Sequence, residues 1–505
     1  MSRGRAVLRR LRSILTPGSG VTDRTVTGGV WMGLNNVADR ALQLGTILFL
    51  AGLLSPAAFG LYGIALVVQS ALQRLSQLGL DTALIRRRES DVDRYLDTVW
   101  TVELGRGLLL GTVLYAAAPL VGSVFGEPRV VSLLRVLALT PVLDGLRNPG
   151  VVYLVKDLEF HRDAAYKLSN RVAYTLVGVG VGYATRSVWA LVAAMLAAQC
   201  TSLVVSYLVH DYRPWLRFDF AAARELFEYG RWIFTSEGLM FLINEGDDAF
   251  VGWLLGSATL GIYQLSYRLS NAPTTEITHP IQQVLFPAYA KVQDDDASLR
   301  QGYYTSVRVI TLLSFPAAVG IVLVGPVFVP ALLGGEWLPM VVPMQVFAVY
   351  AGLRSFRSAT VPLFRAIDRP DYDTKIRLLK LALLAPFVYP AASAFGATGV
   401  ALVILGHTVV VAPIASYLAV RSVDGRLTTL GRILSYPAIA SGAMGVVVYL
   451  VRERLVGVPS LVELPLLVLV GVITYGAAVA ALEQRFGIGL APIYRTFQDW
   501  VAGTA

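Results

Sequence analysis

The chain has 505 residues, of which 55% are hydrophobic and 15% charged, and its formal net charge is +9. So few charges, together with apolar runs of roughly 20 residues that recur along the chain, exclude an ordinary water-soluble protein and favour membrane-spanning helices. Runs such as AVGIVLVGPVFVPALL (318–333) do not alternate between apolar and polar residues, which excludes a transmembrane β-barrel. The basic residues flank the apolar runs, so we expect membrane topology and no nucleic-acid partner.

Residues 1–27 form a basic segment ahead of the first apolar run. In SRGRAVLRRLRSIL, Val7, Leu11 and Leu15 share a helical face and the arginines lie on the other, which favours a helix lying on the anionic inner leaflet. A disordered basic tail fits the same residues. The segment lacks the small-residue cleavage site of a signal peptide.

Fourteen apolar segments follow, each long enough to span a bilayer as a helix. They lie near 28–53, 58–81, 97–121, 130–153, 163–184, 187–209, 231–254, 259–287, 305–333, 338–364, 376–395, 398–420, 431–451 and 461–482. With the N-terminus inside, thirty Lys and Arg residues fall on the inner side and four in outer loops. This bias fits the positive-inside rule. It predicts a multi-pass protein of the cell membrane (plasma or inner) with both termini in the cytosol.

Two similar strings mark an internal repeat. LLSPAAFGLYGIA (53–65) and LLGSATLGIYQLS (254–266) align at an offset of 201, which pairs Leu54 with Leu255, Gly60 with Gly261 and Tyr62 with Tyr263. Each string joins the first two helices of a six-helix block. The predicted fold is therefore an all-α integral membrane protein with two parallel six-helix lobes, 28–220 and 221–430, followed by two helices and a cytosolic tail in 431–505.

Polar side chains recur at helical spacing inside several predicted spans. A charge at the bilayer centre costs about 2.5–3.5 kcal/mol even on a lenient scale, so these groups are expected to face protein or water. The arginines predict a cationic cavity for an anionic cargo such as a phosphate or an acidic sugar, because guanidinium groups bind such oxygens in bidentate fashion. The candidate cavity residues are Arg40, Arg74, Arg268, Arg135, Arg354, Arg357, Asn36, Gln43, Gln77, Gln264 and Asn271.

A second set of polar residues in the same helices leaves two interpretations open. These groups could accept a coupling proton or sodium ion, or they could form structural ion pairs that pin helices together, such as Asp39 with Arg40 or Asp81 with Arg74. The residues of this set are Asp39, Asp81, Asn244, Glu245, Asp247 and Asp248.

Other chemistry-bearing residues give little sign of a cofactor. The one cysteine, Cys200, lies in an apolar run and is expected to be a small core residue, and the four histidines lack metal-site spacing, so we expect no metal and no cofactor. GVGVGYA (178–184) lacks the spacing of a dinucleotide fingerprint, and its Gly178 and Gly182 are expected to allow close helix packing. The predicted outer loops are all short, which argues against an enzyme with an external catalytic domain.

Several strings resemble one family. LLSPAAFGLYGIA and DDAFVGWLLGSATLGIYQLSYRL (247–269) resemble Wzx-type polysaccharide flippases of the multidrug/oligosaccharidyl-lipid/polysaccharide exporter superfamily. FPAYAKVQDDDASLRQGYY (286–304) is similar to the branch of lipopolysaccharide and exopolysaccharide exporters. The resemblance implies a V of two six-helix lobes and alternating access. The implied cargo is a polyprenyl- or dolichyl-linked oligosaccharide, turned from the cytosolic to the outer leaflet. Relatives commonly carry an arginine where this chain has Gly52, so the role of that arginine is not carried over.

Three other functions stay open at this point. A drug or cation exporter of the same superfamily would favour acids and aromatics in its cavity. A membrane enzyme that makes or modifies glycans would need catalytic residues that the short loops do not supply. A scaffold for envelope assembly is the third. Membrane lipids and other glycan-assembly proteins are the further partners expected, and coupling to a proton or sodium gradient is open.

Overall fold

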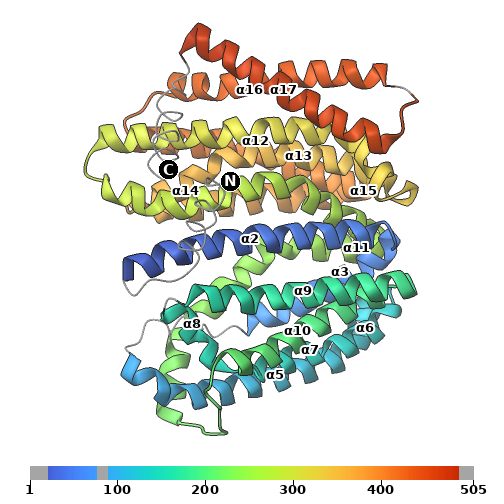
Figure 1. Cartoon of the computed structure of the whole chain (residues 1–505), viewed down its shortest axis with the longest axis vertical. Helices are drawn as coiled ribbons and strands as arrows, with labels where there is room; N and C mark the ends of the chain where they lie inside the picture. The colour runs from blue at the N-terminus through green and yellow to red at the C-terminus, as the bar shows by residue number, and fades with distance from the viewer. Residues whose placement is uncertain (1–20, 77–88, 158, 456, 488–505) are drawn as a thin grey trace, which may run out of the picture. The chain divides into compact units, whose positions relative to one another are not determined.

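The computed structural model describes residues 21–76, 89–157, 159–455 and 457–487, and the elements within these ranges are all helices (Figure 1). In chain order they are α2 (Val21–Ala51), α3 (Pro56–Leu75), α5 (Glu89–Val124), α6 (Arg129–Leu137), α7 (Leu139–Gly145), η1 (Pro149–Val151), α8 (Val152–Lys156), α9 (Phe160–Thr185), α10 (Trp189–Val209), α11 (Phe220–Lys291), α12 (Asp296–Leu332), η2 (Gly335–Met340), α13 (Val341–Phe356), η3 (Arg357–Ala359), α14 (Thr360–Ala366), α15 (Pro370–Ser422), α16 (Leu427–Arg454) and α17 (Ser460–Phe486). Within the described ranges, 8 helical segments are long and apolar enough to cross a membrane. The predicted all-α membrane fold is confirmed.

Within the described residues the fourteen predicted spans coincide with helical stretches, with two differences in continuity; the end of the second span, 77–81, lies outside the described residues. Two pairs of spans run together as α11 and α15, interrupted by non-helical backbone at Gly256 and Gly396. The fourth and tenth spans were expected to be continuous and are broken into short pieces, α6 to α8 and η2 to α14. In the fourth, Pro149 opens η1 and the Asn148 side chain caps it. Proline cannot donate a backbone hydrogen bond, so the break has a local cause there.

The chain divides into two compact units, Met1–Gly261 and Ile262–Ala505. The boundary lies inside α11, and it assigns the first part of that helix to the first unit. The sequence-based lobe boundary at residue 220 stays a prediction.

The turns of the two halves share an unusual backbone conformation. Gly126 follows α5 with φ 64°, and Gly334 follows α12, the equivalent helix of the repeat, with φ 94°. Arg186 follows α9 with φ 44°, and Gly396 takes the equivalent place within α15 with φ 57°. Left-handed backbone is uncommon away from glycine. Its recurrence at matching turns supports the internal repeat.

The repeated LLSP-type string forms a helix start in the first half. Ser55 is the N-cap of α3, its hydroxyl accepts from the Ala58 backbone N–H, and Pro56 occupies the first turn. Serine caps and first-turn prolines both favour a helix beginning at that point. Two repeat-equivalent glycines then touch within the first unit. A Cβ added at Gly60 would lie 1.6 Å from the Ser257 carbonyl oxygen, and one at Gly261 would lie 2.0 Å from the Pro56 carbonyl oxygen.

Close packing through glycine also joins α9 to its neighbours. A Cβ at Gly178 would lie 3.1 Å from that of Ala194 on α10, and a Cβ at Gly182 would lie 2.5 Å from a methyl of Leu50 on α2. The expectation that these two glycines serve helix packing is confirmed.

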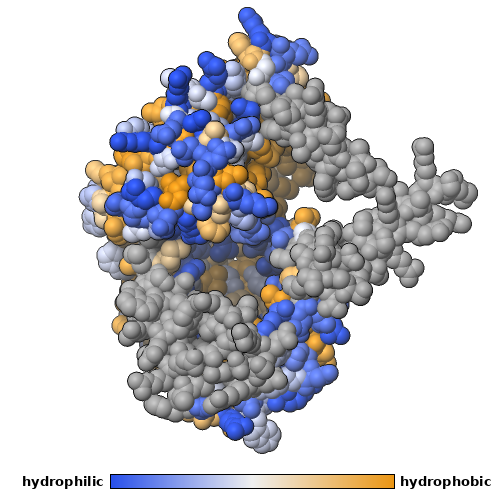
Figure 2. Space-filling view, turned by 90° about the vertical axis from the view of Figure 1, so that its left-hand side faces the viewer, coloured by the Kyte–Doolittle hydropathy of each residue, from blue (hydrophilic) through white to orange (hydrophobic). Residues whose placement is uncertain are grey.

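One end of the helices in the second unit is rich in hydrophilic side chains. Figure 2 looks onto the ends that lie at the left of Figure 1, where α11 turns into α12, and its upper part is largely blue. Lys291 is the last residue of α11, Arg300 lies in the second turn of α12, and Arg369 precedes α15. This polar end suits the water-facing side of a membrane protein.

Candidate functional site

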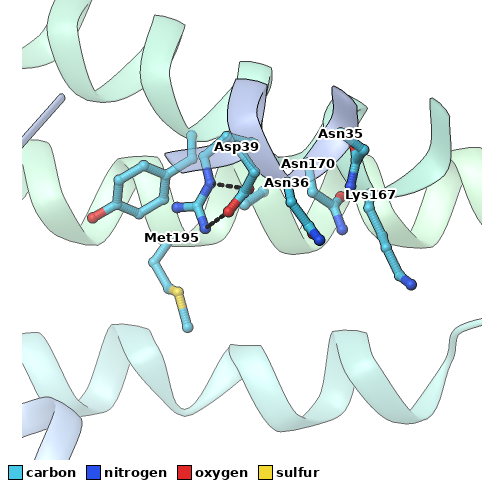
Figure 3. A pocket seen from close by; sticks show the side chains of 9 residues that line it. Asn35, Asn36, Asp39, Lys167, Asn170 and Met195 are labelled. Atoms are coloured by element: carbon cyan, nitrogen blue, oxygen red, sulfur yellow. Dashed lines mark hydrogen bonds and ion pairs between the residues drawn. The ribbon is translucent and has the colours of Figure 1, made fainter. Parts of the chain in front are cut away.

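A polar pocket of about 410 Å³ lies in the first unit. Figure 3 shows α2 and α9 supplying most of its side chains, with Met195 of α10 opposite. Its lining residues are Asn35, Asn36, Asp39, Lys167, Asn170, Arg171, Tyr174, Met195 and Ala198. Two of these, Asn36 and Asp39, are sequence-predicted site residues. Amide and charged groups at this density on membrane helices call for polar partners, because apolar surroundings would leave them unsatisfied.

Two amide oxygens of the pocket are open. Asn35 Oδ1 and Asn170 Oδ1 are buried and have no hydrogen-bond partner within the described part of the chain. An amide oxygen has two lone pairs and accepts from hydroxyl or N–H donors. Two acceptors beside the pocket therefore have unused hydrogen-bonding capacity.

An ion pair holds α2 to α9 beside these amides. Arg171 Nε lies 2.6 Å from Asp39 Oδ1, and its Nη2 lies 3.3 Å from Oδ2, so the contact is bidentate. The two side chains are 25% and 28% exposed. The sequence had offered Arg40 as the structural partner of Asp39; the structure gives Arg171, whose pairing was not foreseen.

We expect breaking this pair to destabilise the first unit. Arg171→Gln or Asp39→Asn should each lower the free energy of unfolding by about 1–3 kcal/mol, because the remaining charge loses its partner. The double replacement should cost less than the sum, with a coupling of at least about 0.5 kcal/mol. Thermal or denaturant unfolding of the purified protein measures both quantities.

The matched control is the more exposed pair at the start of α9. Arg162 lies 3.0 Å from Glu159, with side chains 54% and 37% exposed. The same cycle on this pair should give a coupling of about 0–1 kcal/mol at most. Strictly additive effects at Asp39 and Arg171 would contradict their assignment as a coupled pair.

The other candidate residues of the first unit are spread over several surfaces. Arg40 is exposed and donates to Gln43 Oε1 at 2.8 Å. Arg74 of α3 forms an ion pair with Glu245 of α11 at 3.1 Å, a partner other than the Asp81 suggested by the sequence. Arg135 is exposed, 5.2 Å from the ring centre of Tyr115.

The remaining members of the predicted polar set are placed as follows. Asn244 is exposed, and Asp247 and Asp248 are half-buried on α11. Gln77 and Asp81 lie outside the described residues.

Five candidates belong to the second unit. Arg268 is exposed and Gln264 half-buried on α11. Asn271 is buried and donates to the Tyr267 carbonyl oxygen at 2.9 Å. Arg354 donates to Thr275 Oγ1 at 3.1 Å, while Arg357 is buried at 8% exposure. Arg354 and Arg357 come together at the broken tenth span.

Cys200 differs from the expectation. Its side chain is exposed on α10, so the prediction of a core residue was wrong. An apolar run on a membrane helix contains residues that face outward as well as inward, so burial does not follow from composition alone. No group of three metal-binding side chains occurs among the residues searched, which are the described ones.

Sequence reasoning missed Lys167, Asn170 and Arg171 as pocket residues, because they fall near the start of the fifth span where long side chains usually reach water. The sequence did contain one sign that this region pairs charges, however. Asp163 and Lys167 are four residues apart and pair at 2.6 Å, and the equivalent helix of the second half carries Asp373 and Arg377 at the same spacing, 2.9 Å apart.

Comparison with known proteins agrees with this architecture. The family model described as "Polysaccharide biosynthesis protein" matches residues 49–342. The lipopolysaccharide biosynthesis protein WzxC of Escherichia coli (strain K12) is 27% identical over 383 residues, which cover 75% of this chain and 77% of that protein. The teichuronic acid biosynthesis protein TuaB of Bacillus subtilis (strain 168) is 24% identical over 366 residues, with coverages of 71% and 75%.

Two solved structures share the fold. The lipid II flippase MurJ in an inward closed conformation superimposes with a TM-score of 0.72 at 12% identity, covering 89% of this chain and 99% of that one. An inward-facing multidrug resistance MATE family transporter of the MOP superfamily gives 0.60 at 18% identity, with coverages of 82% and 97%. Since the family model spans more than half of the sequence, this chain belongs to the polysaccharide biosynthesis protein family, and its fold is the one shared by these two solved structures.

Proposed function

We propose that this protein is a flippase that turns a lipid-linked oligosaccharide or polysaccharide repeat unit from the cytosolic to the outer leaflet of the cell membrane, for assembly of a surface glycan. Both termini would lie in the cytosol, and the carrier would be a polyprenyl or dolichyl lipid. WzxC is named a lipopolysaccharide biosynthesis protein and TuaB a teichuronic acid biosynthesis protein, and a third relative, ExoT of Rhizobium meliloti (strain 1021), is named a succinoglycan biosynthesis transport protein.

The observation that carries the proposal is the amide-lined pocket of the first unit. The side chains of Asn35, Asn36 and Asn170 line it with amide groups of the kind that bind sugar hydroxyls, and Lys167 and Arg171 lie beside them. A cation exporter would need a free acid in its lining, whereas the one acid of this pocket, Asp39, is already held by Arg171; Tyr174 is its one aromatic residue. The polar lining therefore favours a glycan over a lipophilic cation.

The physical task needs no nucleophile. The sugar and phosphate groups must cross a hydrocarbon layer that excludes them, while the lipid tails remain in the membrane. Alternating access of a hydrated, cationic cavity would lower that barrier by replacing water around the phosphate with guanidinium donors such as Arg40, Arg74 and Arg268. Glu245, Asp247 and Asp248 are the groups that we assign to coupling with a proton or sodium gradient, or to structural pairing.

Removal of the gene from its host tests this proposal against its rivals. A flippase mutant should lose the surface glycan and accumulate complete lipid-linked repeat units on the cytosolic leaflet. Loss of a glycan-synthesising enzyme would leave the repeat unit incomplete, and loss of a drug exporter would leave surface glycan unchanged. Either of the last two results would contradict the flippase.

A further inference from the structure

Four cationic side chains gather in the second unit where the tenth span is broken. Arg354 lies in the last turn of α13, Arg357 opens η3, and Arg377 and Lys380 lie near the start of α15. Lys380 lies within electrostatic range of the three arginines and of one acid, Asp373. Because Asp373 pairs with Arg377 at 2.9 Å, three cations remain in excess. We call Arg354, Arg357 and Lys380 the break cluster.

Arg357 is the buried member of this cluster. It is 8% exposed, and its Nε and Nη1 atoms have no hydrogen-bond partner within the described part of the chain. A buried cation with open donors is costly unless something binds it. The guanidinium presents its donors as a planar fork that fits two oxygens of one phosphate or carboxylate group.

The other two members make no ion pair within the described part of the chain. Arg354 donates to the Thr275 hydroxyl at 3.1 Å and lies 5.5 Å from the ring centre of Tyr350, contacts that leave its charge in place. Lys380 makes no ion pair with any described residue, and like Arg354 it is half-buried. Arg354 and Lys380 are therefore the more accessible members of the cluster, and Arg357 is the least.

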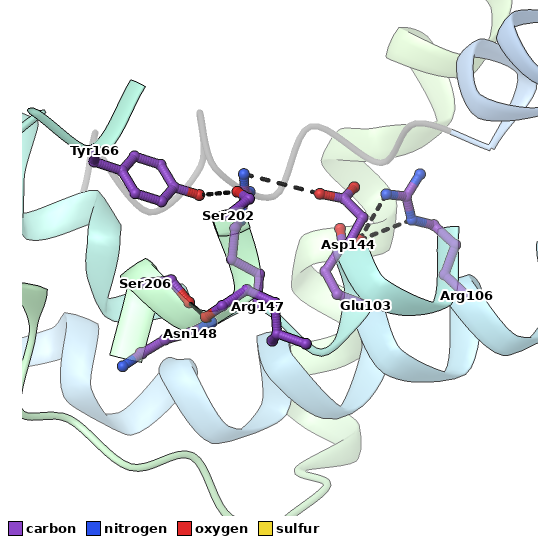
Figure 4. Close-up of polar contacts among 9 residues, drawn as sticks. Glu103, Arg106, Asp144, Arg147, Asn148, Tyr166, Ser202 and Ser206 are labelled. Carbon is purple, nitrogen blue, oxygen red and sulfur yellow. Dashed lines mark hydrogen bonds and ion pairs between the residues drawn. The ribbon is translucent and has the colours of Figure 1, made fainter. Parts of the chain in front are cut away.

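The equivalent break in the first unit pairs more of its cations, although the Nζ atom of Lys156 at the end of α8 is also buried without a hydrogen-bond partner among the described residues. The string GLR occurs at 145–147 and again at 352–354, just before each break. In the first unit Arg147 lies 3.9 Å from Asp144, and Arg106 lies 2.7 Å from Glu103. Figure 4 shows these pairs beside Asn148, whose backbone N–H donates to Ser206 Oγ at 3.0 Å.

The helices that follow the two breaks, α9 and α15, differ in charge in the same way. Asp163 and Lys167 in the first unit correspond to Asp373 and Arg377 in the second, and on the same alignment Asn170 stands where Lys380 does. The first unit therefore offers an amide where the second offers a cation. At this pair of equivalent positions the surplus charge is found in the second unit.

We propose that the break cluster, formed by Arg354, Arg357 and Lys380, is a binding site for a phosphate-bearing anion. Two guanidinium forks and an ammonium group match the charge and the several oxygens of a diphosphate. Lys380 lies one turn inside the predicted span 376–395, toward the inner membrane surface where lipid phosphates lie. The assignment of this anion to a lipid-linked glycan rests on the proposed function, whereas the site itself does not.

Binding to the purified protein tests the site without turnover. Inorganic pyrophosphate and farnesyl diphosphate in lipid nanodiscs share the head group and separate a free anion from a lipid as its source. Arg357→Gln and Lys380→Gln should each weaken binding of the preferred probe by about 10-fold or more, since each removes a charge-assisted contact. Lys380→Arg should stay within about threefold of wild type, because the charge and its donors are kept.

The matched control is Arg365→Gln, which removes the same charge from an exposed position on α14, close to Arg357 in the chain. It should bind as the wild type does. Unchanged affinity in both the Arg357→Gln and Lys380→Gln proteins, with folding confirmed by an unaltered elution profile, would overturn the site. A wild-type protein that binds diphosphate but flips no glycan would contradict the proposed function and leave the site standing. A wild-type protein that flips glycan, together with cluster variants that bind diphosphate as the wild type does, would contradict the site and leave the proposed function standing.

Discussion

Gly60→Ala and Gly261→Ala should each abolish stable folding of the first unit. The added Cβ at Gly60 would lie 1.6 Å from the Ser257 carbonyl oxygen, and the one at Gly261 would lie 2.0 Å from the Pro56 carbonyl oxygen. Both obstacles are backbone atoms, so α3 and α11 must separate to admit either methyl group. Overpacking typically costs about 1–3 kcal/mol and occasionally more, and a clash with fixed backbone belongs at the upper end. The melting temperature and the yield of folded protein in detergent measure the effect.

The controls for this prediction are Gly45→Ala on α2 and Gly246→Ala on α11, where a Cβ would meet nothing within 4 Å. These two should be neutral or slightly stabilising, because alanine favours a helix over glycine by up to about 1 kcal/mol. A Gly60→Ala protein that melts with the wild type would show that the two repeat-equivalent segments are not packed as described.

Replacing Arg40 and Arg268 should strongly reduce transport and leave the stability of the protein almost unchanged. Arg40 and Arg268 are both exposed, and Arg40 donates to Gln43. Exposed residues of this kind change stability by roughly 0.5 kcal/mol or less when replaced. If they bind the anionic part of the cargo, however, each loss should slow transport by about 10-fold or more, and the Arg40→Ala/Arg268→Ala double variant should export no glycan.

The control here is Arg454→Ala, which removes an exposed arginine at the end of α16, outside the repeated helices. It should export glycan as the wild type does. Surface glycan in the cells and protein level in the membrane are measured together for every variant. If the double variant exports as much glycan as the wild type does, neither arginine takes part in transport.

Hydropathy and charge were enough to predict the helices, because a bilayer demands long apolar segments and sorts the basic residues to one side. The breaks in the fourth and tenth spans were harder to predict from the sequence. Pro149 is a visible cause of the first, and Pro362 stands in the first turn of α14 directly after the second. Prolines also lie inside the continuous helix α12, so a proline in the sequence does not by itself show where a span breaks.

The sequence predicted which residues lie at polar sites better than it predicted which residues they pair with. Asn36 and Asp39 do line a polar pocket, and Arg354 and Arg357 do lie near each other. The partners of Asp39 and Arg74 come from other helices, at Arg171 and Glu245. Helical spacing finds residues on one face of one helix, so partners across helices stay hidden until the helices are packed. The functional roles of all these residues stay predictions.

The most direct test of the account is flipping by the purified protein in vesicles. A fluorescent lipid-linked oligosaccharide is placed in both leaflets, and an impermeant quencher then reports how fast the inner pool reaches the outer surface. The account predicts that vesicles containing the wild-type protein lose nearly all fluorescence, whereas protein-free vesicles and those with the Arg40→Ala/Arg268→Ala protein keep about half. Wild-type vesicles that retain the same protected half as protein-free vesicles would contradict it.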